Sequence, residues 1–323
     1  MRESPRDERW RMKILVMGAG AIGAYFGARL HQAGEEVVFC ARGRNLPALK
    51  EHGLEVRSPR GDFHGLVRAT GNPREFAPYD LILFTVKMYD TDAAAQSLAG
   101  CLAPGGAILT LQNGVESESR LTEYFGRDAI MAGCARAGVE LVGPGKVHHL
   151  TTGVIEYGEL DGRETPRALK IADAFRRAGI FGELVSDIFS FRWSKLLWNS
   201  AFNTVTTLTH RTVGEVLDDP YGAALIRTLM NETLAVARAD GAKLGPDRIE
   251  TLLEHSRKNL RALKTSTRQD YERGARLEYD ALSGGVVRAA HRHNIAVPAM
   301  ETVHALLRLL DRSTSAQAIS SKP

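Results

Sequence analysis

The chain has 323 residues, of which 44% are hydrophobic and 25% are charged, which suits about two domains with cores of their own. Its formal net charge of +4 comes from interspersed charged residues instead of basic blocks, which argues against nucleic acid as a partner and favours a small anionic molecule. Three widely spaced cysteines, Cys40, Cys101 and Cys134, form no CxxC or Cys/His ligand set, a pattern typical of the reducing cytoplasm.

The first apolar stretch resembles a signal peptide in outline, because Arg11-Met-Lys13 precedes the apolar run of residues 14–28. Four glycines in that run, and the motif described next, argue against export. No window approaches the roughly eighteen apolar residues of a membrane span, so no membrane association is expected. Residues 1–12 and 313–323 are polar, and we predict flexible ends there.

Residues 13–40 predict a dinucleotide-binding fold. KILVM (13–17) is typical of a buried parallel strand, a helix through Ala33 ends at Gly34, and EVVFC (36–40) is a second strand. The GxGxxG fingerprint between the first strand and the helix has the context that it requires. Its glycines allow a tight turn, close approach of a pyrophosphate, and packing of the helix on the strand, while the helix N-terminus binds phosphate. The predicted cofactor-binding residues of this turn are Gly18, Ala19, Gly20, Ala21, Ile22 and Gly23.

The end of the second strand indicates which dinucleotide binds. NAD sites place an acidic residue there for the ribose 2′-hydroxyl, whereas NADP sites have an arginine nearby. Here the strand ends Cys40-Ala-Arg42-Gly-Arg44, with no acidic residue within reach. We therefore predict NADP(H), with Arg42 as the partner of its 2′-phosphate and Arg44 as a helper; the alternative is a solvated arginine loop.

Alternating strands and helices continue to about residue 186. LILFTV (81–86) and AILTL (107–111) are predicted strands on either side of a helix over 91–101, and three later strands, 139–142, 146–150 and 153–156, are predicted to form hairpins. Lys87 follows the first of these strands, and Gln112-Asn113-Gly114 follows the second. Ligands of open α/β sheets bind at this carboxyl edge, although a lysine there is often only a solvated edge residue.

From Asp187 to Arg312 apolar residues follow helical periods, with breaks expected at 218–220, 241, 245–246, 284–285 and 298. Residues 300–310 have an amphipathic pattern that suits a core helix or the interface of a homodimer. The predicted fold is therefore α/β, with a Rossmann-type doubly wound sheet over 13–186 and an all-helical substrate and catalytic domain over 187–312.

One predicted helix, residues 192–207, carries a polar row on an otherwise apolar surface. Lys195, Asn199 and Asn203 are spaced four and four, which places them on one face. Buried polar groups need partners, and two interpretations stay open. The row is either a polar seam satisfied by neighbouring backbone, or a line of donors in which a desolvated lysine supplies a proton.

With these residues in place, the chain resembles the ketopantoate reductases (2-dehydropantoate 2-reductases) from Lys13 to Arg312. The matching motifs are GAGAIG (18–23), Thr85-Val-Lys87, Gln112-Asn-Gly114, Lys195-xxx-Asn199-xxx-Asn203, Ser266-xx-Gln269-Asp270, Glu278 and Ile295-Ala-Val-Pro298. The resemblance implies an NADPH-dependent oxidoreductase that reduces the 2-keto group of ketopantoate to pantoate, on the way to pantothenate and coenzyme A.

The resemblance also implies roles for single residues. Lys195 matches the general acid that protonates the developing alkoxide. The residues that match substrate-binding positions are Asn113, Asn199, Asn203 and Ser266. Those that match positions on the cofactor side are Arg42, Lys87, Asn113, Ala137 and Glu278. Departures from residues common in the family, at Leu263, Thr267, Ser283 and Thr204, fall on the substrate side.

The chemistry of reduction agrees with these roles. Hydride transfer to a ketone leaves negative charge on oxygen, so a donor must point at that oxygen. Desolvation and the charge of Lys87 would make the proton of Lys195 easier to give, whereas an ionised Glu278 would oppose this.

Two alternatives to ketopantoate reduction remain. One is a different 2-keto acid, or an imine, reduced on the same scaffold. The other is a redox sensor that binds NADP(H) and a protein partner without turnover, against which the Lys-Asn-Asn face argues. His148-His149 and His291-Arg-His293 lack the spacing of a metal site, and no metal is expected.

Overall fold

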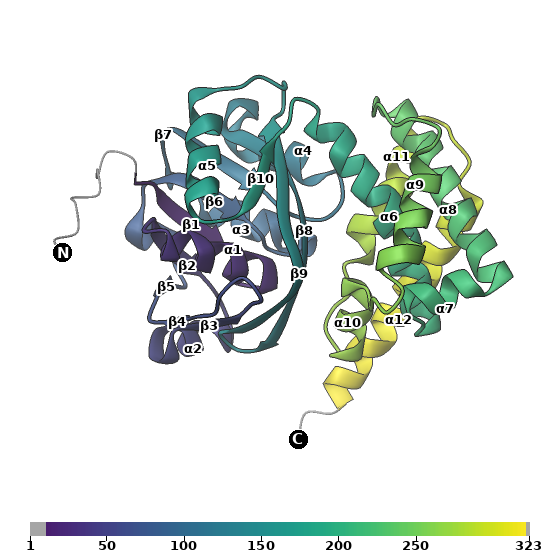
Figure 1. Cartoon of the computed structure of the whole chain (residues 1–323), viewed down its shortest axis with the longest axis horizontal. Coiled ribbons are helices and arrows are strands. Elements are labelled where there is room, and N and C mark those ends of the chain that lie inside the picture. Colours follow the sequence, from purple (N-terminus) through teal and green to yellow (C-terminus); the bar gives the residue numbers. More distant parts are fainter. Residues whose placement is uncertain (1–10, 321–323) are drawn as a thin grey trace. The chain divides into compact units, whose positions relative to one another are not determined.

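The computed structural model describes residues 11–320, with side-chain surroundings described for residues 11–311 except 152. The chain divides into two compact units, shown by sequence colour in Figure 1. Unit 1 takes the chain up to Gln112 together with Ser117–Ile188, and unit 2 takes Asn113–Glu116 together with the chain from Phe189 onward. A four-residue segment that interrupts unit 1 in sequence therefore belongs to the helical unit.

Unit 1 is built on one mixed sheet. Among the described residues the strand order is β4-β3-β9-β8-β7-β6-β1-β2-β5, with β10 beside β9. Each neighbouring pair in the series β8, β7, β6, β1, β2, β5 is parallel, whereas β9 is antiparallel to β8. The bounds are β1 (Lys13–Met17), β2 (Glu36–Cys40), β3 (Leu54–Arg57), β4 (Phe63–Gly65), β5 (Arg68–Thr70), β6 (Tyr79–Phe84), β7 (Leu102–Thr110), β8 (Ile130–Gly143), β9 (Lys146–Glu159) and β10 (Phe181–Leu184).

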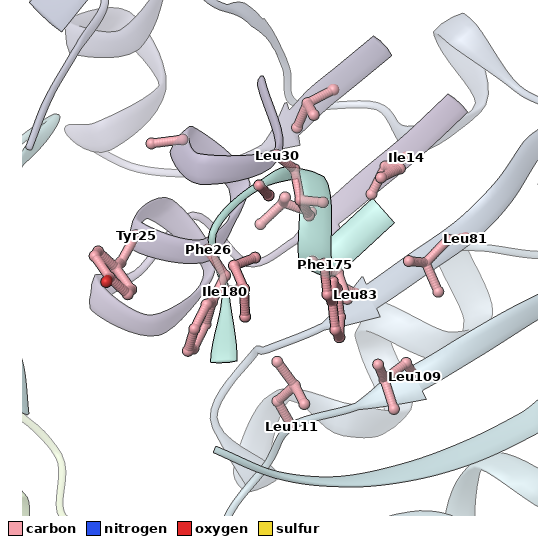
Figure 2. Close-up of a cluster of buried hydrophobic side chains, with 14 of the residues drawn as sticks. Ile14, Tyr25, Phe26, Leu30, Leu81, Leu83, Leu109, Leu111, Phe175 and Ile180 are labelled. Carbon is pink, nitrogen blue, oxygen red and sulfur yellow. The ribbon is translucent and has the colours of Figure 1, made fainter. Parts of the chain in front are cut away.

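Helices cover both faces of this sheet because successive strand residues point to opposite sides. Ile14 and Val16 pack with α1 (Ala21–Gln32) and α5 (Pro166–Arg177), whereas Leu15 and Met17 pack with α3 (Thr91–Ser97) and α4 (Ser117–Phe125). Figure 2 shows the first of these cores, where Phe26 and Leu30 of α1 and Phe175 of α5 lie near strand residues such as Leu81, Leu83 and Leu109. The remaining short elements are α2 (Asn45–His52), η2 (Pro73–Phe76), η3 (Met88–Asp90) and η4 (Arg127–Ala129).

Unit 2 is all-helical over its described residues. Its elements are α6 (Ile188–Thr209), α7 (Val213–Asp218), α8 (Pro220–Ala239), α9 (Arg248–Asn259), α10 (Ser266–Glu272), the π-helix η5 (Asp280–Gly284), α11 (Gly285–Arg292) and α12 (Pro298–Ser320). The core of unit 2 centres on fully buried Trp193, Leu197 and Phe202 of α6, which pack with residues of α8, α11 and α12.

The predicted fold class is confirmed, and the breaks predicted at 218–220 and 298 fall where α8 and α12 begin. The break predicted at Gly284-Gly285 is wrong, because η5 continues directly into α11. Gly284 serves packing there: a Cβ at this position would lie 2.5 Å from Oδ1 of Asp280. The separate strands predicted at 146–150 and 153–156 form one strand, β9, which pairs with an equally long β8 through register shifts.

The ends of the chain and its buried cysteines complete the comparison. Helix α12 continues to Ser320, past Arg312. Of the flexible ends predicted for 1–12 and 313–323, residues 1–10 and 321–323 lie outside the described residues, whereas 313–320 belong to α12. Within the described part of the chain no helix is both long and apolar enough to cross a membrane. The three cysteines are buried free thiols.

Candidate cofactor and catalytic sites

The glycine-rich turn between β1 and α1 is fixed by backbone and by one hydroxyl. The N–H groups of Gly18 and Ala19 both donate to the carbonyl of Cys40 at 3.1 Å, at the end of β2. The hydroxyl of Thr85, which follows β6, donates to the carbonyl of Gly18 at 2.7 Å. Gly18 has a φ of +104°, which favours glycine, and a Cβ there would lie 2.8 Å from the Val86 nitrogen. The Thr85-Val-Lys87 motif thus supports the turn.

The other two glycines of the fingerprint differ in what surrounds them. A Cβ on Gly23 would lie 2.3 Å from the Gly18 carbonyl oxygen, so this position needs glycine for close packing. A Cβ on Gly20 would meet nothing within 4 Å, so the space beside it is open. Helix α1 begins at Ala21 with no side-chain cap and no acidic residue in its first turn. An uncapped helix N-terminus beside open space fits the pyrophosphate of a dinucleotide.

Arg42 lies two residues beyond β2, and its side chain is 76% exposed. It forms an ion pair with Asp90 of η3, a carboxylate that the sequence analysis did not place near this loop. Asp90 follows β6, and β1 lies between β6 and β2 in the sheet. The order of the strands, and not the local sequence, therefore brings Asp90 near Arg42. An exposed guanidinium at this strand end fits a 2′-phosphate, which would replace Asp90 as the partner of Arg42.

Three other residues named in the sequence analysis lie in unit 1. Lys87 is half-buried at the N-terminus of η3, directly after the exit of β6. Gln112 is buried at the exit of β7, where its Nε2 donates to the carbonyl of Val86 and to the Thr91 hydroxyl, each at 2.9 Å. Ala137 is half-buried on β8 and pairs with Gly153 of β9. Gln112 therefore joins the ends of the two strands whose exits were predicted to bind ligand.

In unit 2 the structure brings Lys195, Asn113 and Glu278 together. The Nζ of Lys195 on α6 donates to Oδ1 of Asn113 at 3.0 Å. The Nδ2 of Asn113 in turn donates to Oε2 of Glu278 at 3.3 Å. Lys195 and Asn113 are half-buried and Glu278 is buried. These three residues, 82 and 165 positions apart from Asn113 in sequence, form one connected set that we call the Lys195–Asn113–Glu278 set.

The C-terminal part of the same α6 face is connected to α10. Asn203 is 2% exposed, and its Nδ2 donates to the Thr267 hydroxyl at 3.2 Å and to the Ser266 hydroxyl at 3.4 Å, the latter a weak bond. Its buried Oδ1 has no partner among the described residues. Asn199 is buried on α6, one turn from Lys195 and one turn from Asn203, whereas Ser266 is exposed at the start of α10.

Helix α6 also carries hydroxyls that behave differently from this face. Thr204, Thr206 and Thr207 donate to backbone carbonyls of the preceding turn, which is the ordinary fate of buried threonine in a helix. Lys195 and Asn203 bond instead to side chains of other segments. Side-chain bonds of this kind favour the line of donors over the polar seam.

One residue to which the sequence analysis gave no role, Arg192, binds the segment Asn113–Glu116. Arg192 is 2% exposed, and its Nη2 donates to the carbonyl of Gly114 at 2.6 Å. Gly114 itself has a φ of +86°, and a Cβ there would lie 2.5 Å from the carbonyl oxygen of Ala281 in η5. Arg192 could have been found, because a charged residue three positions before Lys195 on an apolar helix demands a partner.

The departures from the family pattern have structural partners. Thr267 supplies a hydroxyl to Asn203, and Ser283 bonds to the His304 ring at 3.0 Å. Leu263 packs against the core of unit 2. Thr204 leaves α6 unbroken. Among the residues described, no group of three or more His, Cys, Asp or Glu could hold a metal ion, and His293 bonds to Asp240.

Comparison with known proteins supplies the family. The sequence model of the family described as "Ketopantoate reductase PanE/ApbA" matches residues 14–162, and that of its C-terminal part matches residues 187–311. The chain belongs to the ketopantoate reductase family. The two matches fall on opposite sides of the change from alternating strands and helices to helices alone.

Individual relatives agree with this assignment. A 2-dehydropantoate 2-reductase of Archaeoglobus fulgidus is 32% identical over 297 residues, covering 92% of this chain and 97% of the relative. The crystal structure of a 2-dehydropantoate 2-reductase from Geobacter metallireducens matches at a TM-score of 0.87 and 34% identity, over 92% of this chain and 99% of that one. D-mandelate dehydrogenase, solved with NADH and anilino(oxo)acetate, shares the fold at a TM-score of 0.88 but only 23% identity, over 94% and 100% of the two chains.

Proposed function

We propose that this protein is an NADPH-dependent 2-dehydropantoate 2-reductase that reduces the 2-keto group of ketopantoate and releases pantoate. The observation that carries the proposal is the Lys195–Asn113–Glu278 set in a chain of this family. The reaction converts a C=O group to CH–OH by adding a hydride to carbon and a proton to oxygen.

The cofactor side of the proposal rests on unit 1. NADPH, when bound, supplies the hydride. The first turn of α1 would hold the pyrophosphate, with Gly20 leaving room for it, and Arg42 would hold the 2′-phosphate. Lys87 and Ala137 are proposed as further cofactor contacts on the grounds of the family resemblance.

The proton comes from Lys195. An ammonium group has three donors and no acceptor, so one N–H can bond to Asn113 while another points at the substrate oxygen. Negative charge grows on that oxygen as hydride arrives, and a donor already in place stabilises it. Proton transfer by such a positioned group typically contributes about 10²–10⁴-fold to the rate.

Asn113 has only one chemically sensible orientation in this set. An ionised carboxylate only accepts hydrogen bonds and an ammonium only donates them. The amide nitrogen must therefore face Glu278 and the amide oxygen must face Lys195, as the structure has them. Glu278 thus acts on Lys195 through Asn113, by holding the amide so that its oxygen directs the ammonium.

The remaining residues on this face bind the substrate in our proposal. Asn199, Asn203 and Ser266 present amide and hydroxyl groups, which suit the carboxylate and hydroxyl of ketopantoate. Asn203 is held by Thr267, so the departure at position 267 keeps a polar partner next to the substrate face.

The test is the oxidation of NADPH by purified protein, followed by the loss of reduced-nicotinamide absorbance, with ketopantoate and a panel of other 2-keto acids. We expect turnover with ketopantoate to exceed that with the others, and NADPH to be preferred over NADH. Faster turnover with another 2-keto acid would contradict the substrate assignment. NADPH binding without turnover on any member of the panel would contradict the enzymatic role altogether.

A cytoplasmic location and a homodimer are part of the same proposal. Buried free thiols at Cys40, Cys101 and Cys134 support a reducing compartment. The amphipathic pattern of residues 300–310 supports pairing, since Leu306 and Leu309 are exposed on α12.

A further inference from the structure

Arg288 on α11 contacts both the segment that carries Asn113 and the segment that carries its acceptor, Glu278. Its Nε and Nη2 donate to the two carboxylate oxygens of Glu116 at 2.9 and 2.6 Å. Its Nη1 donates to Oδ1 of Asp280 at 2.8 Å, and Nη2 also donates to the Asp280 carbonyl at 2.9 Å. Glu116 lies three residues after Asn113, and Asp280 lies two residues after Glu278. One guanidinium therefore joins the Asn113 segment to the Glu278 segment.

The geometry of this contact is specific to arginine. The planar guanidinium forms a bidentate pair with Glu116 and has a further N–H directed at Asp280, which a lysine could not reproduce. Both carboxylates raise the pKa of Arg288 above its usual range, so it stays charged throughout the working pH range. The Arg288 side chain is 42% exposed and that of Glu116 is 19% exposed, so the pair lies at the edge of unit 2 and not in its core.

The set that Arg288 borders is sensitive to small displacements. The Asn113 to Glu278 distance of 3.3 Å is already at the long end for an N–H···O bond, so a shift of a few tenths of an ångström would break it. Without that bond the orientation of the Asn113 amide is less constrained, and its oxygen directs Lys195 less closely. In the same segment Gly114 is bound by Arg192 and Glu116 is bound by Arg288.

We propose that Arg288 is a positioning residue for the reduction, which sets the separation of Asn113 and Glu278 through Glu116 and Asp280 and so directs the proton of Lys195. The inference rests on the proposed function, because it presumes that Lys195 delivers the proton. It assigns to Arg288 a role that is exerted through Glu116 and Asp280.

The experiment compares Arg288→Met and Glu116→Gln with Arg227→Met in the full-length protein. Arg227→Met is a matched control, because it removes another arginine–glutamate bidentate pair of unit 2, Arg227 with Glu250, on α8 and α9. For each we would measure kcat with ketopantoate, the Kd for NADPH, the Tm, and hydrogen exchange of the peptide that spans residues 112–117.

We expect Arg288→Met and Glu116→Gln to lower kcat about tenfold to a hundredfold, because displacements near 1 Å cost up to about 10² in rate. The Kd for NADPH should stay within about threefold, the Tm should fall no more than in Arg227→Met, and the 112–117 peptide should exchange faster. A kcat that is unchanged, or lowered only as far as in Arg227→Met, would overturn the role of Arg288. Absence of turnover in the wild type would instead overturn the proposed function, and it is seen before any variant is compared.

Discussion

Replacing Gly23 by alanine would place a methyl group where unit 1 has no room for one. The new Cβ would lie 2.3 Å from the Gly18 carbonyl oxygen, 2.5 Å from the Thr85 hydroxyl and 2.8 Å from a methyl of Val16. The nearest of these neighbours is a backbone oxygen of the turn itself, so the backbone must move. Overpacking of this kind costs about 1–3 kcal/mol, and alanine returns up to about 1 kcal/mol within a helix. We therefore expect a net destabilisation of about 1–2 kcal/mol.

Gly20→Ala, in the same motif, should change NADPH binding and leave the stability of the protein unchanged. Its Cβ would meet no atom within 4 Å, so the free energy of unfolding should stay within about 0.5 kcal/mol of wild type. If the open space beside Gly20 receives the pyrophosphate, the methyl group should weaken NADPH binding about tenfold, or about 1.4 kcal/mol.

Urea unfolding and fluorescence titration with NADPH would measure both effects. Gly245→Ala is the control, since it adds a methyl group in open space between α8 and α9 and should change neither quantity. Wild-type stability of Gly23→Ala would refute the packing argument. Wild-type affinity of Gly20→Ala would mean that the pyrophosphate binds elsewhere.

Other expected outcomes concern cofactor choice, a helix cap and pH. Arg42→Ala should raise the Kd for NADPH about tenfold or more and leave the Kd for NADH unchanged. Asp90→Asn, which removes the ion pair of Arg42, should lower the Kd for NADPH relative to that for NADH. Equal effects on both cofactors would contradict the assignment. Thr212→Ala removes half of the capping box of α7 and should cost about 1 kcal/mol in urea unfolding, and no loss would contradict the cap. Burial raises the pKa of the Cys40 thiol from 9.0 to about 11. The unfolded chain therefore loses this proton first, and stability should fall as pH rises above 9. Wild type should lose about 1 kcal/mol more than Cys40→Ala between pH 8 and pH 10, and equal losses would contradict the shift.

The parts of this protein that could be predicted from sequence are those whose cause is local. The strand, glycine turn and helix of residues 13–32 follow from contiguous residues, and so does the long helix α6. The face of α6 could be predicted because helical spacing alone places Lys195, Asn199 and Asn203 together. The error at Gly284-Gly285 has a partly tertiary cause, since a Cβ at Gly284 would lie 3.0 Å from the His304 ring of α12 as well as 2.5 Å from Oδ1 of Asp280.

The ion pairs next to the proposed sites had no local signal. Asp90 reaches Arg42 only because the sheet order brings the exit of β6 near the end of β2. Arg288 reaches Glu116 across 172 positions of sequence. Charged residues on a solvated helix face look alike in sequence, so only the assembled fold distinguishes Arg288 from its neighbours. The membership of Asn113–Glu116 in the helical unit is equally a property of the fold.

The central claim is that Lys195 gives the proton, and Lys195→Ala tests it most directly. The variant would be compared with wild type and with Lys258→Ala, a control that removes an exposed lysine of α9. The measurements are kcat with ketopantoate and the Kd for NADPH. We predict a loss of about 10²–10⁴ in kcat, with the Kd for NADPH within about threefold of wild type and Lys258→Ala unaffected. A kcat for Lys195→Ala within about threefold of wild type would contradict the account.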